Sequence, residues 1–511
     1  MNGRRLLAGL TLAGGMAAAV PAVPGAAMAG DSAAAASPPT SHREAVIIGF
    51  NRSPRLALEP LRYADDDAIK LGAMLGLVYD QVATLVEPDD ETARLYPGFV
   101  VVRPTRQAVA AALSAAARRI ERAIEQGQEG ELLFAYSGHG DVDREGRGLV
   151  YLADGALSQL DLAAALGAAA ARYRVTLLID ACNAALLVGV RGSGSYRDRV
   201  PAERRSRELE QLNRAGLILS TSGRAEVHEW GLLLSGIFSY EVRSALLGAA
   251  DLDDDRRITF AELDAFVAAA NARIANPVAR LAPTIRGPGG RDDAVVIDLN
   301  QARAPAFLRV APEVVGHAFL QDAALVRHAD FNKTAERGFW LMLVSSQPYA
   351  MVRGGEEHPL LVTGDSVAAL GPARPTADIA GRGMLHDYLE RNLFQTPFDR
   401  AFAERHWQRC DESAAPVALS AIEIARLVLA PYLLPYAVGC GLAALGGLGY
   451  GGGWIAYLGA VEAHWADETR ALNTAANVLA IGGLATAAAG AVVVTGTSVV
   501  LGGELISWQL E

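Results

Sequence analysis

The chain has 511 residues and a formal net charge of −11 at pH 7. Because one domain usually takes roughly 100 to 200 residues, this length predicts two or three domains. The negative charge argues against a nucleic-acid partner, since proteins that bind phosphate backbones carry a basic face. Cysteine occurs only at 182, 410 and 440, so a disulfide framework is not expected to hold the fold together.

The first 29 residues are typical of a secretory signal peptide. Arg4 and Arg5 precede an apolar run from Leu6 to Val20, and Ala27-Met28-Ala29 is a small-x-small cleavage site. We expect general secretion, with the twin-arginine route as the alternative. Residues 30–42 form a spacer rich in Ala, Ser and Pro that we expect to be disordered. The abundance of Ala and Gly, with Arg in place of Lys, indicates a GC-rich bacterial gene.

Strand and helix patterns alternate over residues 43–300. Apolar runs of strand length cover residues 44–50, 81–88, 131–137, 174–181 and 215–222. Helical patterns cover residues 64–77, 238–247 and a stretch from a Thr105 cap to about Ile124. Apolar strands separated by helices predict an α/β fold whose mostly parallel sheet has helices on both faces. Reacting groups in such folds lie at the carboxyl ends of the strands.

His139 and Cys182 each follow the end of one of these strands. A thiol becomes a useful nucleophile when a neighbouring histidine favours the thiolate, which requires the two strands to be close in the sheet. Gly138 would allow the turn, and the N–H groups of Gly140 and Cys182 would stabilise an oxyanion. The alternative is that His139 is a tolerated turn residue and Cys182 a small buried side chain.

The stretches FAYSGHGD (134–141) and LLIDACNAA (177–185) resemble the two catalytic motifs of the caspase-like cysteine peptidases, which include caspases, metacaspases and bacterial relatives. The resemblance spans about residues 43–300, with PLRYADDDA after the first strand and SGRAEVHEW and GIFSYEVRSALLGAAD after the fifth. It implies that His139 is the general base and acid and Cys182 the nucleophile, with Gly140 and Cys182 forming the oxyanion hole. The implied reaction is peptide-bond cleavage through a thioester, with no cofactor required.

The same resemblance bears on substrate preference. Metacaspase-like members cut after Arg or Lys and carry an acid two residues before the cysteine, where this chain has Asp180. A caspase arginine that would suit an acidic P1 residue, the residue before the cleaved bond, would fall one position away from Arg62. With Asp180 at the position of the metacaspase acid, we therefore favour a basic P1 residue. Asp180 could instead order the loop after its strand. The residues after the cysteine are Asn183-Ala184-Ala185 and not His-Ser-Gly, which puts turnover in doubt.

An arginine-rich, glycine-bearing segment separates the fourth and fifth strands. Loops of this composition are exposed and easily cut. A peptidase with a basic preference would process itself between Arg191 and Arg207, whereas the alternative is a solvated linker.

Asp251, Asp253, Asp255 and Glu262 occupy the 1, 3, 5 and 12 positions of an EF-hand-type loop, with the Arg257 carbonyl at position 7. Position 6 should be glycine and is Arg256, which places a less permissive backbone at the sharp turn. Calcium is therefore one interpretation, and an acidic helix-capping turn is the one we favour.

Residues 301–415 predict a small second domain of mixed strands and helix without a motif that indicates its role. Over residues 416–511, Leu427–Val461 and Ala471–Gly503 contain no charged residue, and each exceeds the ~20 apolar residues that cross a bilayer. We expect two membrane helices, joined by Glu462–Arg470; the alternative is a buried hairpin of a soluble domain.

Together these features predict an exported cysteine endopeptidase, tethered to a membrane with its catalytic domain in the periplasm or outside the cell. Its partners would be a protein or peptide substrate and the membrane. Two alternatives stay open. One is a catalytically weak or inactive caspase-fold binding module. The other is a membrane-active effector that the peptidase releases, because small residues at helix spacing also favour tight helix packing.

Overall fold

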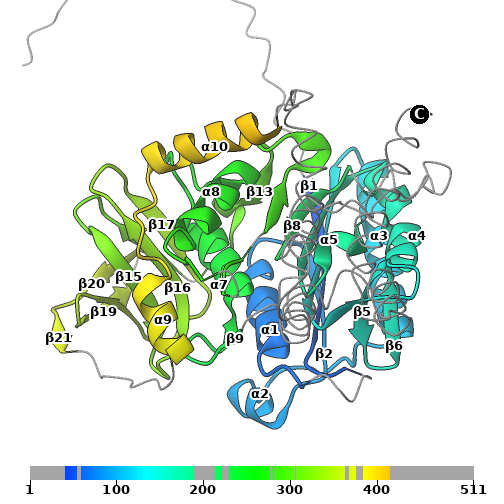
Figure 1. The fold of residues 1–511 in the computed structure, drawn as a ribbon, viewed down its shortest axis with the longest axis horizontal. Coiled ribbons are helices and arrows are strands. Elements are labelled where there is room, and N and C mark those ends of the chain that lie inside the picture. Colours follow the sequence, from blue (N-terminus) through cyan, green and yellow to red (C-terminus); the bar gives the residue numbers. More distant parts are fainter. Residues whose placement is uncertain are drawn as a thin grey trace, which may run out of the picture. The chain divides into compact units, whose positions relative to one another are not determined.

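A computed structural model describes the central part of the chain (Figure 1). The described residues are 41–53, 59–188, 212, 214–220, 229–276, 279–281, 283–304, 306–362, 367–375 and 384–414. The expected signal peptide, the spacer up to residue 40, the self-processing segment Arg191–Arg207 and the membrane hairpin therefore lie outside them. Within the described residues, no helix is both long enough and apolar enough to cross a membrane.

The described residues include a six-stranded sheet that confirms the expected parallel architecture. Its order is β12-β8-β7-β3-β1-β2, and every neighbouring pair is parallel except β12 with β8. The strands are β1 (Ser41–Phe50), β2 (Gln81–Val86), β3 (Glu129–Gly138), β7 (Arg174–Asp180), β8 (Gly216–Leu219) and β12 (Thr284–Arg286). The carboxyl ends of the five parallel strands therefore lie along one edge.

Helices cover both faces of this sheet, as its continuous apolar strands require. The side chains of Val46 and Phe134 join one buried cluster with α3 (Arg106–Glu125) and α4 (Gln159–Ala170). Their neighbours Ile47 and Leu133 point to the other face and join a second cluster with α1 (Ala64–Leu75), α7 (Ile237–Ser244) and α8 (Phe260–Ala270). Figure 1 shows α3 and α4 on one side of the sheet and α1 and α7 on the other.

Local signals account for where these helices begin. The Thr105 side chain accepts a hydrogen bond from the Ala108 N–H, which confirms the expected cap of α3. Ser158 and Thr259 cap α4 and α8 with reciprocal bonds to the acid at the third helical position. After α7 the chain continues as a π-helical turn, η2 (Ala245–Ala249).

Residues beyond 300 form a mostly antiparallel sheet of order β16-β15-β18-β19-β20-β14-β17, with β21 paired to β19. Only β14 and β20 run parallel among its described pairs. The strands are β14 (Ala306–Val310), β15 (Gly316–Asp322), β16 (Arg327–Lys333), β17 (Phe339–Leu343), β18 (Tyr349–Arg353), β19 (Glu356–Val362), β20 (Val367–Leu370) and β21 (Arg374–Pro375).

This antiparallel sheet packs closely on the helices of the parallel sheet. Leu308 and Leu341 belong to the same buried cluster as Leu246 and Phe266. At Gly248, whose φ is +122°, a Cβ atom would lie 1.9 Å from the Trp340 carbonyl oxygen, so only glycine permits this approach of η2 to β17. One apolar core thus continues from the parallel sheet into the antiparallel sheet.

Short elements complete the described fold. The small strands are β4 (Gly140–Val142), β5 (Gly148–Leu152), β6 (Gly155–Ser158), β9 (Glu229–Trp230), β10 (Ser235–Gly236), β11 (Arg257–Thr259) and β13 (Val295–Asp298). The remaining helices are α2 (Asp90–Leu95), α5 (Ala184–Leu187), α9 (Met384–Asn392), α10 (Arg400–Ala414) and two 3-10 turns, η3 (Pro288–Gly290) and η4 (Leu299–Gln301). The β9–β10 hairpin and the β4–β5–β6 ribbon lie next to the site described below.

Candidate active site

His139 follows directly on the end of β3, where the chain makes a turn that only glycine can make. Gly138 has φ +156°, and a Cβ atom there would lie 2.5 Å from the Tyr136 hydroxyl oxygen and 2.8 Å from the Phe50 carbonyl oxygen. Both contacts are shorter than real Cβ contacts, so a larger residue would move the strand end. Gly138 therefore fixes how the backbone leaves the sheet and where His139 lies.

Hydrogen bonds fix both the backbone and the imidazole ring of His139. The Tyr136 hydroxyl and the Tyr151 N–H both donate to the His139 carbonyl oxygen, each at 3.1 Å. The ring Nε2 lies 2.9 Å from the Glu59 carbonyl oxygen. A carbonyl can only accept, so this contact places a proton on Nε2 and leaves Nδ1 as the basic nitrogen. Burial lowers the pKa of His139 below its usual 6.5, so the ring is mainly neutral at pH 7.

Cys182 lies at the same edge of the sheet because β3 and β7 are neighbours. Ser137 pairs with Asp180 in the parallel register, and His139 and Cys182 each follow two positions later. A Cβ atom on Gly140 would lie 2.0 Å from the Cys182 carbonyl oxygen. The backbone next to His139 thus touches the backbone of Cys182, whose thiol is half-buried and forms no disulfide. The structure thus places the backbones of the two residues that the sequence singled out at the same edge of the sheet.

The N–H of Gly140 points away from its partner strand. The His139 carbonyl oxygen accepts from Tyr151 N–H, and the Arg147 carbonyl oxygen accepts from Asp143 N–H at 2.9 Å. These bonds define the alternate, hydrogen-bonded pairs of the β4–β5 ribbon, so Gly140 and Val150 form a pair without mutual hydrogen bonds. The Gly140 N–H is therefore directed out of the ribbon, as an oxyanion donor would need to be.

The residue after the cysteine has an unusual conformation. Asn183 has φ +59°, and its carbonyl oxygen accepts from the Leu186 N–H as the short helix α5 begins. Asparagine adopts the left-handed region more readily than other residues that carry a Cβ atom. The departure from His-Ser-Gly thus places a suitable residue at a sharp turn.

Asp180 ends β7 and is almost fully buried, with 2% of its surface exposed. Its Oδ2 accepts from the Ser239 N–H at 3.1 Å and from the Ser239 hydroxyl at 2.6 Å. Its Oδ1 makes no hydrogen bond of good geometry with the described residues, although the nearby Ser220 side chain favours the charged form and lowers its pKa. Burial raises the pKa of Asp180 to about 7, with the negative charge of Asp67 adding to the effect. The structure therefore leaves one carboxylate oxygen of Asp180 unsatisfied at the sheet edge.

Asp67 is a second acid at this place, and the sequence interpretation missed it. A Cβ atom on Gly236 would lie 3.0 Å from Asp180 Oδ2 and 3.2 Å from Asp67 Oδ2, so the two carboxylates flank the same glycine. Asp67 accepts from the Ser235 hydroxyl and the Gly236 N–H, and its Oδ1 lies 3.3 Å from the Arg243 guanidinium. Asp67 thus has an internal cation, whereas no cation of the described residues lies within ion-pair distance of Asp180.

The β9–β10 hairpin connects this acidic pair to α1. Its Glu229 carboxylate accepts from the backbone N–H groups of Arg62 and Tyr63 at 2.8 to 3.1 Å. The Arg62 side chain is exposed, and its backbone anchors the hairpin. At the other end of the hairpin, Ser235 and Gly236 hold Asp67. The hairpin therefore fixes the acidic pair relative to α1.

The acidic loop that suggested calcium folds as a turn before α8. The carboxylates of Asp251, Asp253 and Asp255 lie within 4.8 Å of one another. Asp251 accepts from the N–H groups of Asp254 and Arg256, at 2.7 and 3.0 Å. Each Asp251 oxygen is thus satisfied by the loop itself, although burial raises the pKa of Asp251 to about 6.

Glu262 and Arg256 complete this loop through contacts inside the protein. Both oxygens of Glu262 accept backbone N–H groups, Oε1 from Leu252 at 3.0 Å and Oε2 from Thr259 at 2.9 Å. Arg256 takes the left-handed conformation that glycine would favour, with φ +63°. Its guanidinium lies 4.1 Å from the centre of the Trp340 ring, a cation–π contact that offsets part of the backbone strain. The geometry agrees with the helix-capping interpretation.

Comparisons with known proteins give limited information. No family model and no curated protein matches the chain. Among solved structures, a protein from Geobacter sulfurreducens is similar at 17% identity and a TM-score of 0.29, covering 48% of this chain and 92% of the other. Caspase-1 from Spodoptera frugiperda is similar at 14% identity and a TM-score of 0.29, covering 49% of this chain and 88% of the other. Similarities this low carry no argument about activity, which must come from the site itself.

Proposed function

We propose that the chain is a cysteine endopeptidase that cuts peptide bonds after arginine or lysine. The observation that carries this proposal is the β3–β7 register, which sets His139 and Gly140 against the backbone of Cys182 at one edge of the sheet. A base, a thiol and an outward-directed N–H in one place are the groups that acyl transfer needs.

The reaction follows from the roles of these groups. His139 Nδ1 takes the proton of the Cys182 thiol, and the thiolate attacks the peptide carbonyl carbon. The Gly140 N–H donates to the oxygen that becomes negative, with the Cys182 N–H as the second donor. As the C–N bond breaks, His139 returns the proton to the leaving amine. Water then attacks the thioester, gives its proton to His139 and releases the acid, so that the thiol is regenerated.

The preference for a basic P1 residue rests on Asp180. A buried carboxylate oxygen without a hydrogen bond is costly, and a cation from a substrate would satisfy it. Asp67 is already neutralised by Arg243, so Asp180 is the acid that remains for the substrate. An arginine side chain would give Asp180 a charge-assisted hydrogen bond in a site of low dielectric constant.

An affinity label tests both the nucleophile and the preference. An arginyl chloromethylketone should add one label to the chain at Cys182, measured by mass spectrometry, and an aspartyl analogue should add none. The Cys182→Ala chain should stay unlabelled with both reagents. Equal labelling by the two reagents would refute the basic preference, and labelling that persists in Cys182→Ala would refute the assigned nucleophile.

Removal of the base tests the mechanism separately. We expect His139→Ala to lower kcat/KM on a fluorogenic arginyl peptide by roughly 10²- to 10⁴-fold, because general acid–base catalysis contributes about that much. Tyr173→Phe is the matched control, because Tyr173 precedes β7 at its amino end, at the other end of the strand from Asp180. A loss below tenfold in His139→Ala would contradict the proposed role.

We further propose that the enzyme cuts its own chain between Arg191 and Arg207, a segment outside the described residues. The expected result is two fragments whose new end follows an arginine, identified by mass spectrometry. The Cys182→Ala chain should remain whole. The same fragments in that variant would mean that another protease makes the cut.

Export and membrane attachment are also part of the proposal. The apolar residues 416–511 would tether the catalytic domain on the outer side of the membrane. In bacterial cells, the chain should resist alkaline extraction from membranes, and a chain ending at residue 415 should be released. Extraction of both forms alike would contradict the tether.

A further inference from the structure

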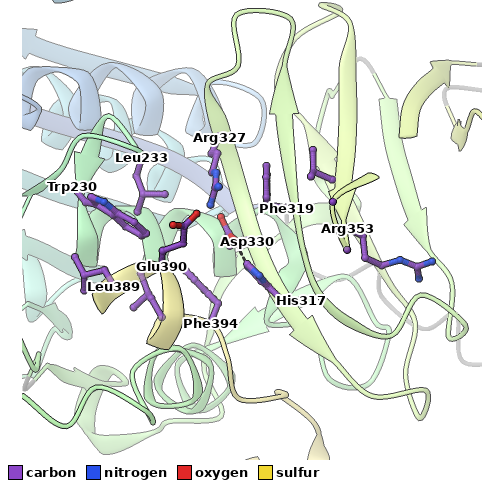
Figure 2. A pocket seen from close by; sticks show the side chains of 14 residues that line it. Trp230, Leu233, His317, Phe319, Arg327, Asp330, Arg353, Leu389, Glu390 and Phe394 are labelled. Carbon is purple, nitrogen blue, oxygen red and sulfur yellow. Dashed lines mark hydrogen bonds and ion pairs between the residues drawn. The ribbon is translucent and has the colours of Figure 1, made fainter. Parts of the chain in front are cut away.

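A cavity of about 200 Å³ lies beside the β9–β10 hairpin, away from the strand ends (Figure 2). The hairpin contributes Trp230, β15 contributes Phe319, β16 contributes Arg327, and α9 with the turn after it contributes Glu390 and Phe394. Side chains from three distant parts of the sequence therefore converge on one space. None of the groups proposed for peptide cleavage lines it.

Arg327 offers this cavity a cation with unused donors. Its guanidinium carbon lies 3.7 Å from the centre of the Phe319 ring. In such a stacked arrangement, the N–H donors at the edge of the guanidinium plane remain available for hydrogen bonds. No carboxylate of the described residues lies within ion-pair distance of Arg327. The buried Asp330 beside it is already used, because it accepts from the Tyr240 hydroxyl and lies 2.6 Å from His317 Nε2. Arg327 and the Asp330 charge interact at longer range, and a ligand carboxylate would add the direct hydrogen bonds that Arg327 does not make with Asp330.

Glu390 offers a negative charge to the same space: Figure 2 shows its carboxylate directed toward the side of the cavity that holds Arg327, and its side chain is half exposed. The Trp230 indole N–H donates to His386 Nδ1 at 3.0 Å, so Nδ1 acts as the acceptor in this contact. His386 Nε2 lies 3.6 Å from Glu390 Oε2, which is too long for a strong hydrogen bond. The Glu390 carboxylate therefore makes only this long contact to His386 and can still accept hydrogen bonds from a ligand.

The walls of the cavity combine apolar side chains with the hydrogen-bonded pair His317 and Asp330. Leu233, Leu389 and Phe394 are each less than 5% exposed, and the Trp230 ring is fixed by its bond to His386. The volume is below the roughly 300 to 1,000 Å³ of sites for drug-sized ligands. The space thus suits a small molecule that carries a carboxylate, an ammonium group and an apolar side chain.

We propose that this cavity is a binding site for a free α-amino acid with an apolar or aromatic side chain. Arg327 holds the carboxylate, Glu390 holds the ammonium group, and Trp230 and Phe394 contact the side chain. The site shares the β9–β10 hairpin with the acidic pair of the candidate active site, but binding does not depend on peptidase activity.

Calorimetric titration of the whole chain carrying Cys182→Ala tests the proposal without any cleavage. L-Leucine, L-phenylalanine or L-tryptophan should bind saturably with one site per chain. The amide of the same amino acid, which lacks the carboxylate, and its N-acetyl form, which lacks the ammonium group, should each bind at least tenfold more weakly. A doubly blocked amino acid that binds as well as the free one would overturn the proposal and would indicate a peptide-binding subsite. Absence of saturable binding by all three amino acids would overturn it as well.

Two substitutions locate the site. Arg327→Gln should weaken binding of the free amino acid at least tenfold, and Glu390→Gln should weaken it more for the free amino acid than for its N-acetyl form. Arg353→Gln is the matched control: Arg353 also lines the cavity, but Figure 2 shows its guanidinium directed away from Arg327 and Glu390. Unchanged thermal unfolding of each variant establishes that it is folded. Equal weakening by Arg353→Gln, or no weakening by Arg327→Gln, would overturn the assignment.

Discussion

Asp180 and Asp251 are both buried aspartates whose pKa is raised by burial, to about 7 and about 6, yet their surroundings differ. Both oxygens of Asp251 accept N–H groups from its own loop, and arginines anchor that loop to the antiparallel sheet. Asp180 uses one oxygen with Ser239 and leaves the other unsatisfied. The comparison teaches that acidic residues alone do not indicate a cation site; what matters is which oxygens the protein itself leaves without a partner.

The largest expected effect separates the two aspartates by activity. Asp180→Asn should lower kcat/KM on an arginyl substrate by roughly 10²- to 10³-fold, because the substrate cation would be buried without its partner. Asp251→Asn should change it by less than about threefold. Steady-state kinetics on both variants gives the result. Equal losses in the two variants would break the comparison.

Stability should depend more on the anchor of the Asp251 loop than on Asp180. Arg337 donates to the carbonyl oxygens of Asp251, of Ala249 at 2.9 Å and of Phe398 at 3.2 Å, and it is almost fully buried. Arg337→Met leaves these carbonyls unpaired and should lower the free energy of unfolding by about 2 kcal/mol. Denaturant unfolding of Arg337→Met and of Asp180→Asn measures the two losses in the free energy of unfolding. A smaller loss than in Asp180→Asn at pH 5 would contradict the anchoring role.

The pH dependence of cleavage sharpens the comparison further. Ionised Asp180 binds a basic P1 residue, and its pKa is raised to about 7, so kcat/KM should fall about fivefold from pH 7 to pH 6. In Asp180→Asn this fall of kcat/KM should disappear. The remaining pH dependence is then set by His139, whose pKa is lowered below 6.5 by burial. An unchanged profile in Asp180→Asn would mean that another group titrates.

The same carboxyl links pH to stability. Because the folded-state pKa of Asp180 is raised above the unfolded value, its contribution to stability is lost as pH rises through 7. The melting temperature of Asp180→Asn relative to the unsubstituted chain should therefore increase from pH 5 to pH 8. A relative decrease over that range would contradict the raised pKa.

The smallest effect concerns the acidic loop. Arg309 contacts both carboxylate oxygens of Asp254 from the antiparallel sheet, and both side chains are about one-third exposed. Arg309→Gln should cost only about 0.5 kcal/mol, since water screens the pair. Adding calcium to the unsubstituted chain should shift its melting temperature little, because the loop already holds the carboxylates of Asp251 and Glu262 with backbone N–H groups. A shift of several degrees, lost in Asp253→Asn, would establish a calcium site.

Much of the parallel sheet could be predicted from the sequence. Its five parallel strands and the start of α3 at Thr105 follow from apolar runs and a capping residue, which are local signals. The candidate base and nucleophile were found in the same way, since each follows a strand end. Their meeting required the strand order, which local patterns do not contain.

Other features could not be predicted because they depend on contacts between distant residues. Asp67 lies on α1, far in sequence from Asp180, and only the hairpin at Gly236 brings them together. Arg256 takes a conformation typical of glycine because Trp340, on another sheet, stacks against its guanidinium. Residues 301–415 carry no motif, and their antiparallel sheet emerged only in the structure.

The sequence by itself determined the period and length of each strand, the caps of the main helices and the chemical types at the strand ends. Tertiary structure alone decided which carboxylate keeps an unsatisfied oxygen and which arginine keeps unused donors. The physical reason is that hydrogen bonds and desolvation are settled by neighbours in space. A carboxylate at the end of a strand has the same chemistry in every sequence, and its surroundings determine whether it caps a turn or awaits a cation.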